Sequence, residues 1–332
     1  IPGYGRGAAL RSAGSRDPCP RLSKLMRGDP AFWDAWSEGP YVRRASDGSC
    51  DLRVSVRKAG IPHAACVIWV DSGMFSISSH RSGIAQRLLP YLGEDVALVV
   101  AEVRKGMPVT SALPLVGPAL ALCDGGATFG HKHPAQAADA AAAVRWVKRN
   151  AASLGVDPAC LLTVGYSAGG HGVLYHAVRP NGYGPHTIHV DGAWVEDEGD
   201  ASVRGVGSLA AVVNPLVRCQ RMRATCNYLL HKKAEVTEAY FEDKTQMKEA
   251  GVAWLLRNGA THFPLVYIAQ AENDTSVPAE TTEEVVAVYK DLAPGCSEHK
   301  LFSGTTHETL SASVELRDDL CAWVKRTIAL QP

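Results

Sequence analysis

The sequence predicts an α/β protein built around a mostly parallel sheet, and three observations support this prediction. Apolar runs of strand length alternate with segments of helix length, as in a parallel sheet that is covered by helices. The chain has 332 residues, of which 46% are hydrophobic and 20% are charged, and this composition is that of a globular protein with a sizeable core. A glycine-rich turn, Gly165–Gly170, joins a strand-like run directly to a helix-like one. We therefore expect about eight strands flanked by helices.

The first 40 residues differ in composition from the rest of the chain. They are rich in Gly, Pro, Arg and Ser, and only Pro30–Trp36 is apolar enough to pack a helical turn against a larger body. We expect residues 1–40 to form an arm or partial cap, and residues 41–332 to form the main domain.

Several segments of the main domain have strand patterns. Residues 41–45 and 52–60 alternate apolar and charged side chains on either side of an Asp47–Gly48 turn, which predicts an antiparallel pair at a sheet edge. Apolar runs predict further strands at Ala65–Val70, Val96–Val103, Cys160–Tyr166, Pro264–Gln270 and His299–Ser303.

Two segments have helical signatures. Pro134–Ser153 is rich in Ala, begins with Pro and is followed by Gly155. Near the C-terminus, apolar residues recur at about helical spacing from Leu310 to Ile328.

Residues 197–262 lack the strand–helix alternation, and we expect them to form an insertion over one edge of the sheet, of the kind that often becomes a lid.

Charge and hydropathy argue against two classes of partner. Lys plus Arg and Asp plus Glu number 34 each, and neither sign forms a long block, so no nucleic-acid-binding surface is expected. The longest weakly polar stretch, Leu113–Cys123, contains a Gly and a Pro and is far shorter than the roughly 20 residues that cross a bilayer. We expect a soluble chain without a transmembrane segment.

The nine cysteines form no C-x-x-C pair and no zinc-type set, so no metal site is predicted. Cys66 and Cys160 fall in or beside apolar runs, where a buried, inert thiol is expected. This pattern favours a reducing compartment such as the cytoplasm. The chain starts at Ile1 rather than Met, which is also compatible with secretion after removal of an N-terminal segment.

The glycine-rich turn has the features of a nucleophile elbow, in which a strand ends in a sharp turn with a serine at its tip and a helix directly behind. A strand-like run precedes Ser167, Gly165 and Gly169 flank it, and Ala168 opens the helix. Backbone N–H groups at a helix N-terminus favour developing negative charge. These features predict that Ser167 is a nucleophile rather than a structural turn residue.

A serine nucleophile needs a base, and the base needs an orienting acid; in this kind of fold both follow the serine, acid first. Asp274 follows the Pro264–Gln270 run and is the predicted acid, with Glu272 in the same loop as the competing candidate. His307 lies between a short strand and the last helix and is the predicted base. The histidines at 131, 133, 171 and 299 lack this combination of order and location.

A serine nucleophile of this kind also needs backbone donors for the oxyanion that forms when it attacks a carbonyl group. One is expected from Ala168, directly after the nucleophile, and others from the loop Asp71–Phe75 after an earlier strand. Because glycine lets a backbone approach a substrate closely, Gly73 and Met74 are the predicted donors there.

In these motifs the sequence resembles the α/β-hydrolase superfamily, and within it the esterase/lipase group of hormone-sensitive-lipase-like esterases, acetylxylan and feruloyl esterases, and kynurenine formamidase. The resemblance covers roughly residues 41–331 and is carried in chain order by VIWVDSGMF, the segment 133–170, NDTSVP and GTTHETL. It implies a cofactor-free serine hydrolase acting through an acyl-enzyme. Ser167 would be the nucleophile, His307 the base and then the acid, and Asp274 the orienting carboxylate.

One motif departs from this resemblance. Members of the group usually carry His-Gly-Gly-Gly, or His-Gly-Gly and another residue, where this chain has Asp71, Ser72, Gly73 and Met74. Met74 would direct a flexible apolar side chain towards the acyl pocket, which puts the acyl-size preference in doubt. The sequence does not identify a partner for Asp71.

We expect hydrolysis of carboxylic esters, either small molecules or polymers, without a cofactor or metal. One alternative is an amidase or peptidase of the prolyl-oligopeptidase type, which normally adds a propeller domain for which this chain has no room. The other is a non-catalytic ligand-binding protein on the same fold. Acyl and alcohol specificity and the oligomeric state stay open.

Overall fold

The computed structural model describes residues 29–44, 51–107 and 129–330. Within these residues one sheet contains the strands β1 (Ser37–Arg43), β2 (Asp51–Arg57), β3 (Ala64–Asp71), β4 (Val96–Glu102), β5 (Val156–Tyr166), β6 (His186–Val190), β7 (Ala193–Asp197), β8 (Gly205–Leu209), β9 (Leu265–Ala271) and β10 (Ser297–Phe302). The predicted Asp47–Gly48 turn, the run Leu113–Cys123 and residues 1–28 of the predicted arm lie outside the described residues.

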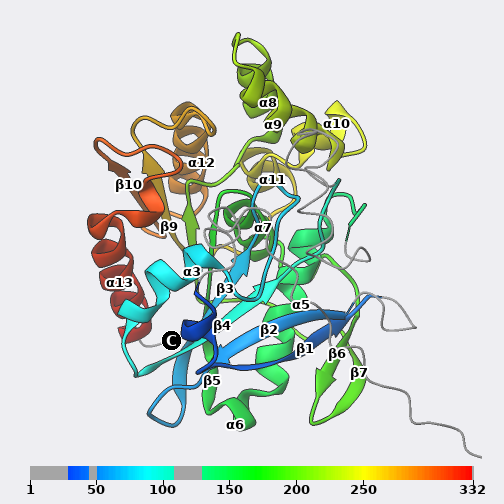
Figure 1. The fold of residues 1–332 in the computed structure, drawn as a ribbon, viewed down its shortest axis with the longest axis vertical. Coiled ribbons are helices and arrows are strands. Elements are labelled where there is room, and N and C mark those ends of the chain that lie inside the picture. Colours follow the sequence, from blue (N-terminus) through cyan, green and yellow to red (C-terminus); the bar gives the residue numbers. More distant parts are fainter. Residues whose placement is uncertain (1–28, 45–50, 108–128, 331–332) are drawn as a thin grey trace, which may run out of the picture.

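The sheet has ten strands in the order β10-β9-β8-β5-β3-β4-β2-β1-β6-β7 (Figure 1). From β4 to β10 along this order neighbouring strands are parallel, and from β4 to β7 they are antiparallel. Every residue of β3 is buried, which explains its continuous apolar run. The predicted α/β class with a mostly parallel sheet is confirmed, with more strands than the expected eight.

The strands β6 and β7 were not predicted from the sequence, because they are short and half polar. The hairpin β6–β7 turns at Asp191 and Gly192, whose φ values of 48° and 84° suit a two-residue turn of the Asp-Gly type, but its strands are short and half polar. The predicted β1–β2 pair therefore does not lie at the sheet edge, because β6 pairs with β1 and β7 forms the edge. β1 also begins at Ser37, inside the predicted arm.

The prediction of an insertion over 197–262 was partly wrong. Its early part contains β8, a fully buried strand between β5 and β9. The sequence of this strand, GVGSL, has a weak strand signature because neighbours leave no room for larger residues. A Cβ at Gly207 would lie 3.2 Å from Val164, and one at Gly205 would lie 3.0 Å from Thr327. The inserted helices begin only after β8.

The described helices are α2 (Pro30–Trp33), α3 (Gly83–Leu88), α5 (Ala135–Arg149), α6 (Ala151–Leu154), α7 (Ala168–Ala177), α8 (Pro215–Arg223), α9 (Tyr228–Ala239), α10 (Lys244–Glu249), α11 (Val252–Asn258), α12 (Ala279–Leu292) and α13 (Val314–Ala329). The predicted helix 134–153 is confirmed as α5 and α6, with Pro134 as the cap and Gly155 in the left-handed region at the end. The last helix is α13, preceded by a 3₁₀ turn at Leu310–Ala312.

The helices cover both faces of the sheet. Apolar residues of α5, α7 and α12 form one core cluster with the sheet, and those of α3 and α13 form the other, together with Trp33 and Trp69. The inserted helices α8, α9 and α10 gather beyond the carboxyl ends of the parallel strands (Figure 1). No helix in the described part of the chain is both long and apolar enough to cross a membrane.

Candidate active site

The predicted strand, turn and helix around Ser167 are present. Ser167 lies between β5 and α7 with φ 56° and ψ −119°, a backbone conformation that a non-glycine residue rarely adopts. The flanking glycines are required by close approach: a Cβ at Gly165 would lie 2.4 Å from the Gly169 carbonyl oxygen, and one at Gly169 would lie 2.4 Å from the Val70 carbonyl oxygen. This crowded turn raises the serine hydroxyl above the sheet end.

Ser167, His307 and Asp274 form one hydrogen-bonded relay although they are far apart in the sequence. His307 Nε2 lies 3.0 Å from Ser167 Oγ, and His307 Nδ1 lies 2.8 Å from Asp274 Oδ2. A carboxylate only accepts hydrogen bonds, so Nδ1 carries the proton and Nε2 is left to accept from the serine hydroxyl. The relay therefore has the geometry of a nucleophile, a general base and an orienting acid.

Backbone donors fix the carboxylate of Asp274. Its Oδ1 accepts the amides of Ser276 at 2.8 Å and Val277 at 2.7 Å, and its side chain is only 1% exposed. Glu272, the competing candidate, is exposed and accepts the Gly304 amide at 2.8 Å. Glu272 thus supports the loop that leads to His307, while Asp274 contacts the imidazole.

Tyr166 holds the His307 loop from the position next to the serine. Its hydroxyl donates to the His307 carbonyl oxygen at 2.5 Å. Burial raises the pKa of Tyr166, so the hydroxyl keeps its proton and remains a donor. The sequence reasoning did not assign this role, although an aromatic residue directly before the predicted nucleophile was visible.

His171, on α7, is not part of the relay. It is buried, and its Nε2 lies 3.0 Å from the Ala250 carbonyl oxygen. Burial lowers the pKa of His171 to about 4, so the ring is neutral at pH 7. Its place is structural, between the nucleophile helix and the inserted helices.

The loop after β3 differs from the predicted arrangement in one donor. The Gly73 amide donates to the Ile77 carbonyl oxygen at 2.8 Å and so is not available to a substrate in this conformation. Among the described residues, no group accepts from the amides of Met74 or Ala168. Met74 and Phe75 have φ values of 50° and 59°, a strained conformation that only surrounding contacts can maintain.

Gln136 supplies several of those contacts. This side chain in the first turn of α5 is 1% exposed. Its Oε1 accepts from the Ser72 hydroxyl at 2.9 Å, and its Nε2 donates to the carbonyl oxygens of Phe75 and Arg104 at 3.0 Å each. Gln136 therefore links both ends of the strained loop. The sequence reasoning missed it, although a glutamine among alanines in a buried helix was a usable signal.

The inserted helices support the same loop from behind. Tyr240, directly after α9, stacks on Phe75 with ring centroids 4.6 Å apart, and its hydroxyl oxygen accepts from the backbone amide of Gln136 at 3.0 Å. Lys233 of α9 also donates to Ser276 at 2.9 Å and pairs with Glu308 at 3.3 Å. The insertion thus contacts the loops that carry the relay.

A cavity of about 230 Å³ opens beside Ser167. Its walls come from the loop after β3, from α3 and from the loop after β10, and they include Asp71, Met74, Ile84, Arg87, Tyr166, His307, Glu308 and Ser311. Within the described ranges, no residue of the 197–262 segment lines it. A role of that segment as a lid over the cavity therefore stays a prediction.

The structure identifies the partners of Asp71. Trp69 Nε1 donates to Oδ1 at 3.3 Å and the Ser79 amide donates to Oδ2 at 3.0 Å. Burial raises the pKa of this carboxyl to about 6, against these hydrogen bonds. Asp71 therefore ties the end of β3 to the following loop, in the place where the resemblance predicts histidine.

Comparison with protein families gives a direct assignment. The family model described as BD-FAE matches residues 117–288, just over half of the chain. The chain belongs to the BD-FAE family. The BD-FAE match includes Ser167 and Asp274, whereas the loop at Gly73–Met74 and His307 lie outside it. Membership confirms the predicted kinship with the esterase/lipase group of the α/β-hydrolases.

Solved structures agree with this fold. A carbohydrate esterase from gut microbiota has 19% identity and a TM-score of 0.57, with 90% of this chain and 98% of that chain covered. An esterase from Pyrobaculum calidifontis has 17% identity and a TM-score of 0.61, with coverage of 88% and 85%. A thermostable carboxylesterase from a metagenomic library has 20% identity and a TM-score of 0.61, with coverage of 89% and 90%. No curated protein sequence matches the chain.

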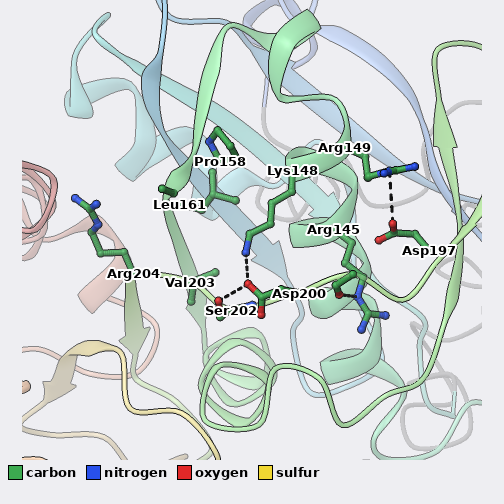
Figure 2. A pocket seen from close by; sticks show the side chains of 12 residues that line it. Arg145, Lys148, Arg149, Pro158, Leu161, Asp197, Asp200, Ser202, Val203 and Arg204 are labelled. Atoms are coloured by element: carbon green, nitrogen blue, oxygen red, sulfur yellow. Dashed lines mark hydrogen bonds and ion pairs between the residues drawn. The ribbon is translucent and has the colours of Figure 1, made fainter. Parts of the chain in front are cut away.

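This BD-FAE protein also has a larger cavity of about 730 Å³ near the amino ends of β5 and β8, and Ser167 is not among the residues that line it (Figure 2). Four cationic side chains line it, and each is engaged. Lys148 pairs with Asp200 at 2.7 Å and Arg149 with Asp197 at 3.5 Å. Arg204 donates to the carbonyl oxygens of Ile328 and Leu330. Arg145 donates to those of Gly184 and Gly199.

Proposed function

We propose that the protein is a carboxylesterase that acts through an acyl-enzyme on Ser167, with His307 as base and Asp274 as orienting acid. One observation carries this proposal: the relay of 3.0 Å and 2.8 Å that links the three side chains at a strained strand–helix turn. Membership of the BD-FAE family supports ester hydrolysis in particular.

In the acylation half, Ser167 Oγ attacks the ester carbonyl carbon while its proton passes to His307 Nε2. Asp274 accepts from His307 Nδ1 throughout and stabilises the imidazolium that forms. His307 then gives the proton to the leaving alkoxide, so the alcohol departs and the acyl group stays on Ser167.

In the deacylation half, water takes the place of the alcohol. His307 Nε2 removes a proton from the water, which attacks the acyl carbon, and the same proton returns to Ser167 Oγ as the carboxylic acid leaves. The enzyme ends in its starting state, and no cofactor is required for this cycle.

The oxyanion is held by the amides of Met74 and Ala168. Both N–H groups lack an acceptor within the described part of the protein, and both residues adjoin the turn or loop that frames Ser167. Because these donors are preorganised, they stabilise the developing charge without reorganisation during the reaction. Gly73 acts indirectly, since its bond to Ile77 closes the loop that presents Met74.

The two alternatives make different predictions. An amidase or peptidase would cleave a 4-nitroanilide with kcat/KM comparable to that of the matched 4-nitrophenyl ester, and a binding protein would cleave neither. The complete relay disfavours a binding protein, because a silent relative has no need of all three groups in contact. We expect efficient cleavage of the ester and much slower cleavage of the anilide.

The deciding experiment compares wild type with Ser167→Ala and with Ser153→Ala, a matched control at an exposed serine of α6. For short 4-nitrophenyl esters, Ser167→Ala should lower kcat/KM by about 10⁴-fold or more at unchanged melting temperature, and Ser153→Ala should behave as wild type. A fluorophosphonate should label wild type but not Ser167→Ala. Hydrolysis that survives Ser167→Ala, or a wild type that neither hydrolyses esters nor reacts with the fluorophosphonate, would overturn the proposal.

A further inference from the structure

The cavity beside Ser167 contains an arginine that the proposed reaction does not use. Arg87, near the end of α3, lines the same cavity as Ser167 and His307. A guanidinium has five N–H donors in a rigid fork, and it stays charged at any working pH. A charged group of this kind in the wall of a small cavity is costly unless a partner balances its charge.

Most N–H donors of the Arg87 guanidinium have no acceptor among the described residues. Arg87 Nη1 donates to Ser311 Oγ at 3.3 Å, a long hydrogen bond to a neutral hydroxyl. No carboxylate in residues 29–44, 51–107 or 129–330 lies at ion-pair distance from Arg87. The charge is half-buried and has no counter-ion in the described structure.

Both carboxyl groups that line the cavity are already occupied. Each oxygen of Asp71 accepts a hydrogen bond, one from Trp69 and one from Ser79. Glu308 is largely exposed and pairs with Lys233 at 3.3 Å. Arg87 is therefore the cationic group of this cavity whose charge is left for a ligand to balance.

We propose that Arg87 binds a carboxylate carried by the substrate, so that the enzyme prefers anionic esters to neutral ones. This inference rests on the proposed esterase function and adds a substrate class to it. An arginine fork binds a carboxylate through two parallel hydrogen bonds, which gives orientation as well as affinity. Arg87 then determines specificity and does not act on the reacting atoms.

The size of the cavity limits the substrate. A volume of about 230 Å³ equals that of roughly eight water molecules at about 30 Å³ each, so the part of the substrate inside the cavity is short. The carboxylate can belong to the acyl part, as in a monoester of a short dicarboxylic acid, or to the alcohol part. Both sources share the chemistry that Arg87 recognises.

Two matched substrate pairs distinguish these sources. On the acyl side, 4-nitrophenyl hemiglutarate is compared with 4-nitrophenyl valerate, which has the same chain length without charge. On the alcohol side, 4-carboxyphenyl acetate is compared with 4-carbamoylphenyl acetate. In one pair, we expect wild type to have about 10- to 100-fold higher kcat/KM for the anionic member, the range for a charged hydrogen bond.

Variants then test the residue. Arg87→Gln should bring the anionic-to-neutral ratio of kcat/KM close to one, and Arg87→Lys should retain part of the preference. Arg53→Gln, at an exposed arginine of β2, removes the same charge away from the cavity and should keep the wild-type ratio. Equal rates within both pairs for wild type, or a preference that survives in a folded Arg87→Gln, would overturn the inference.

A binding measurement separates this inference from the proposed function. Calorimetry with glutarate on Ser167→Ala needs no turnover. We expect binding that Arg87→Gln, introduced in the same background, weakens by about 10-fold or more. Glutarate that does not bind to Ser167→Ala, or that binds equally well without Arg87, overturns the carboxylate site whether or not esters are hydrolysed.

Discussion

Two cavities in the described part of the protein, the one of about 730 Å³ and the one of about 230 Å³ beside Ser167, differ in how their charged groups are satisfied. In the larger cavity, partial burial acts to raise the pKa of Asp200, but hydrogen bonds from Lys148 and Ser202 hold it well below the ordinary value (Figure 2). In the smaller cavity, burial raises the pKa of Asp71 to about 6, because its hydrogen bonds do not offset desolvation. The ionised form of Asp200 is thus stabilised by the folded protein, whereas the ionised form of Asp71 is destabilised.

The same contrast holds for the arginines and amides. Arg145 at the larger cavity donates to two carbonyl oxygens and contacts His186, whereas Arg87 at the smaller one has a single long bond. The amide of Met74, which lines the smaller cavity, and that of Ala168, directly after Ser167, have no acceptor among the described residues. We therefore chose the candidate site by hydrogen-bonding capacity that the fold leaves unused, whereas size alone would have pointed to the larger cavity, whose charged groups are satisfied.

The largest effect should come from the larger cavity, and it should fall on stability. Arg145 is 2% exposed, so Arg145→Met removes a buried guanidinium together with the hydrogen bonds that it donates to the carbonyl oxygens of Gly184 and Gly199. We expect a loss of about 4 kcal/mol in the free energy of unfolding, with kcat/KM unchanged. Arg149→Met, at an arginine whose side chain is mostly exposed, should cost at most about 1 kcal/mol. Denaturant unfolding and ester kinetics measure both, and a fall in kcat/KM in folded Arg145→Met would contradict a purely structural role.

The next effect concerns Asp71 and depends on pH. Below pH 3.8, the ordinary pKa that Asp71 has in the unfolded chain, the carboxyl is protonated in both the folded and the unfolded state, and it does not lower the free energy of unfolding. Between about 3.8 and 6 the unfolded state ionises first, so wild type loses about 3 kcal/mol of stability that it does not recover at higher pH. Asp71→Asn mimics the protonated form, so its stability relative to wild type should rise by that amount between pH 3.5 and pH 7.

Asp200→Asn is the matched comparison, with the opposite sign. Its carboxylate has a lowered pKa, so its contribution is present above the unfolded pKa and is lost as pH falls through the folded pKa. The variant should be less stable than wild type at pH 7 by at most about 1 kcal/mol, because the side chain is more than half exposed. Unfolding curves across this pH range test the pair, and equal signs for the two variants would contradict the contrast between the cavities.

The effect of Gln136 on the strained loop should be smaller than the effects of Arg145 and Asp71. Gln136→Leu removes the bonds to Ser72 and Phe75, so the Met74 amide loses its fixed position. We expect kcat for a short neutral ester to fall by about 10-fold while KM stays within a factor of about two, because the lost interaction operates in the transition state. Gln246→Leu in α10 is the control. A rise in KM without loss of kcat would show that Gln136 shapes binding instead.

Prediction from sequence succeeded where one local pattern carried the information. β3 is buried along its whole length and therefore appears as an apolar run. Chain order led to Ser167, Asp274 and His307, whose side chains are in hydrogen-bond contact in the structure and whose catalytic roles stay a prediction. It failed at β8, where close neighbours require glycine and thereby weaken the strand signature. It also missed β6 and β7, although the Asp191–Gly192 turn between them was a visible signal.

The sequence by itself determined the fold class, the strand–turn–helix around Ser167 and the three residues of the relay, because spacing and chain order encode them. Only the tertiary structure decided that the Gly73 amide donates to Ile77 and that Gln136 links the ends of the strained loop after β3. It also decided that Arg87 lines the cavity beside Ser167 with no counter-ion among the described residues. Hydrogen bonds between distant segments leave no periodic trace in a sequence. Whether a polar group is satisfied is therefore known only after the chain has folded.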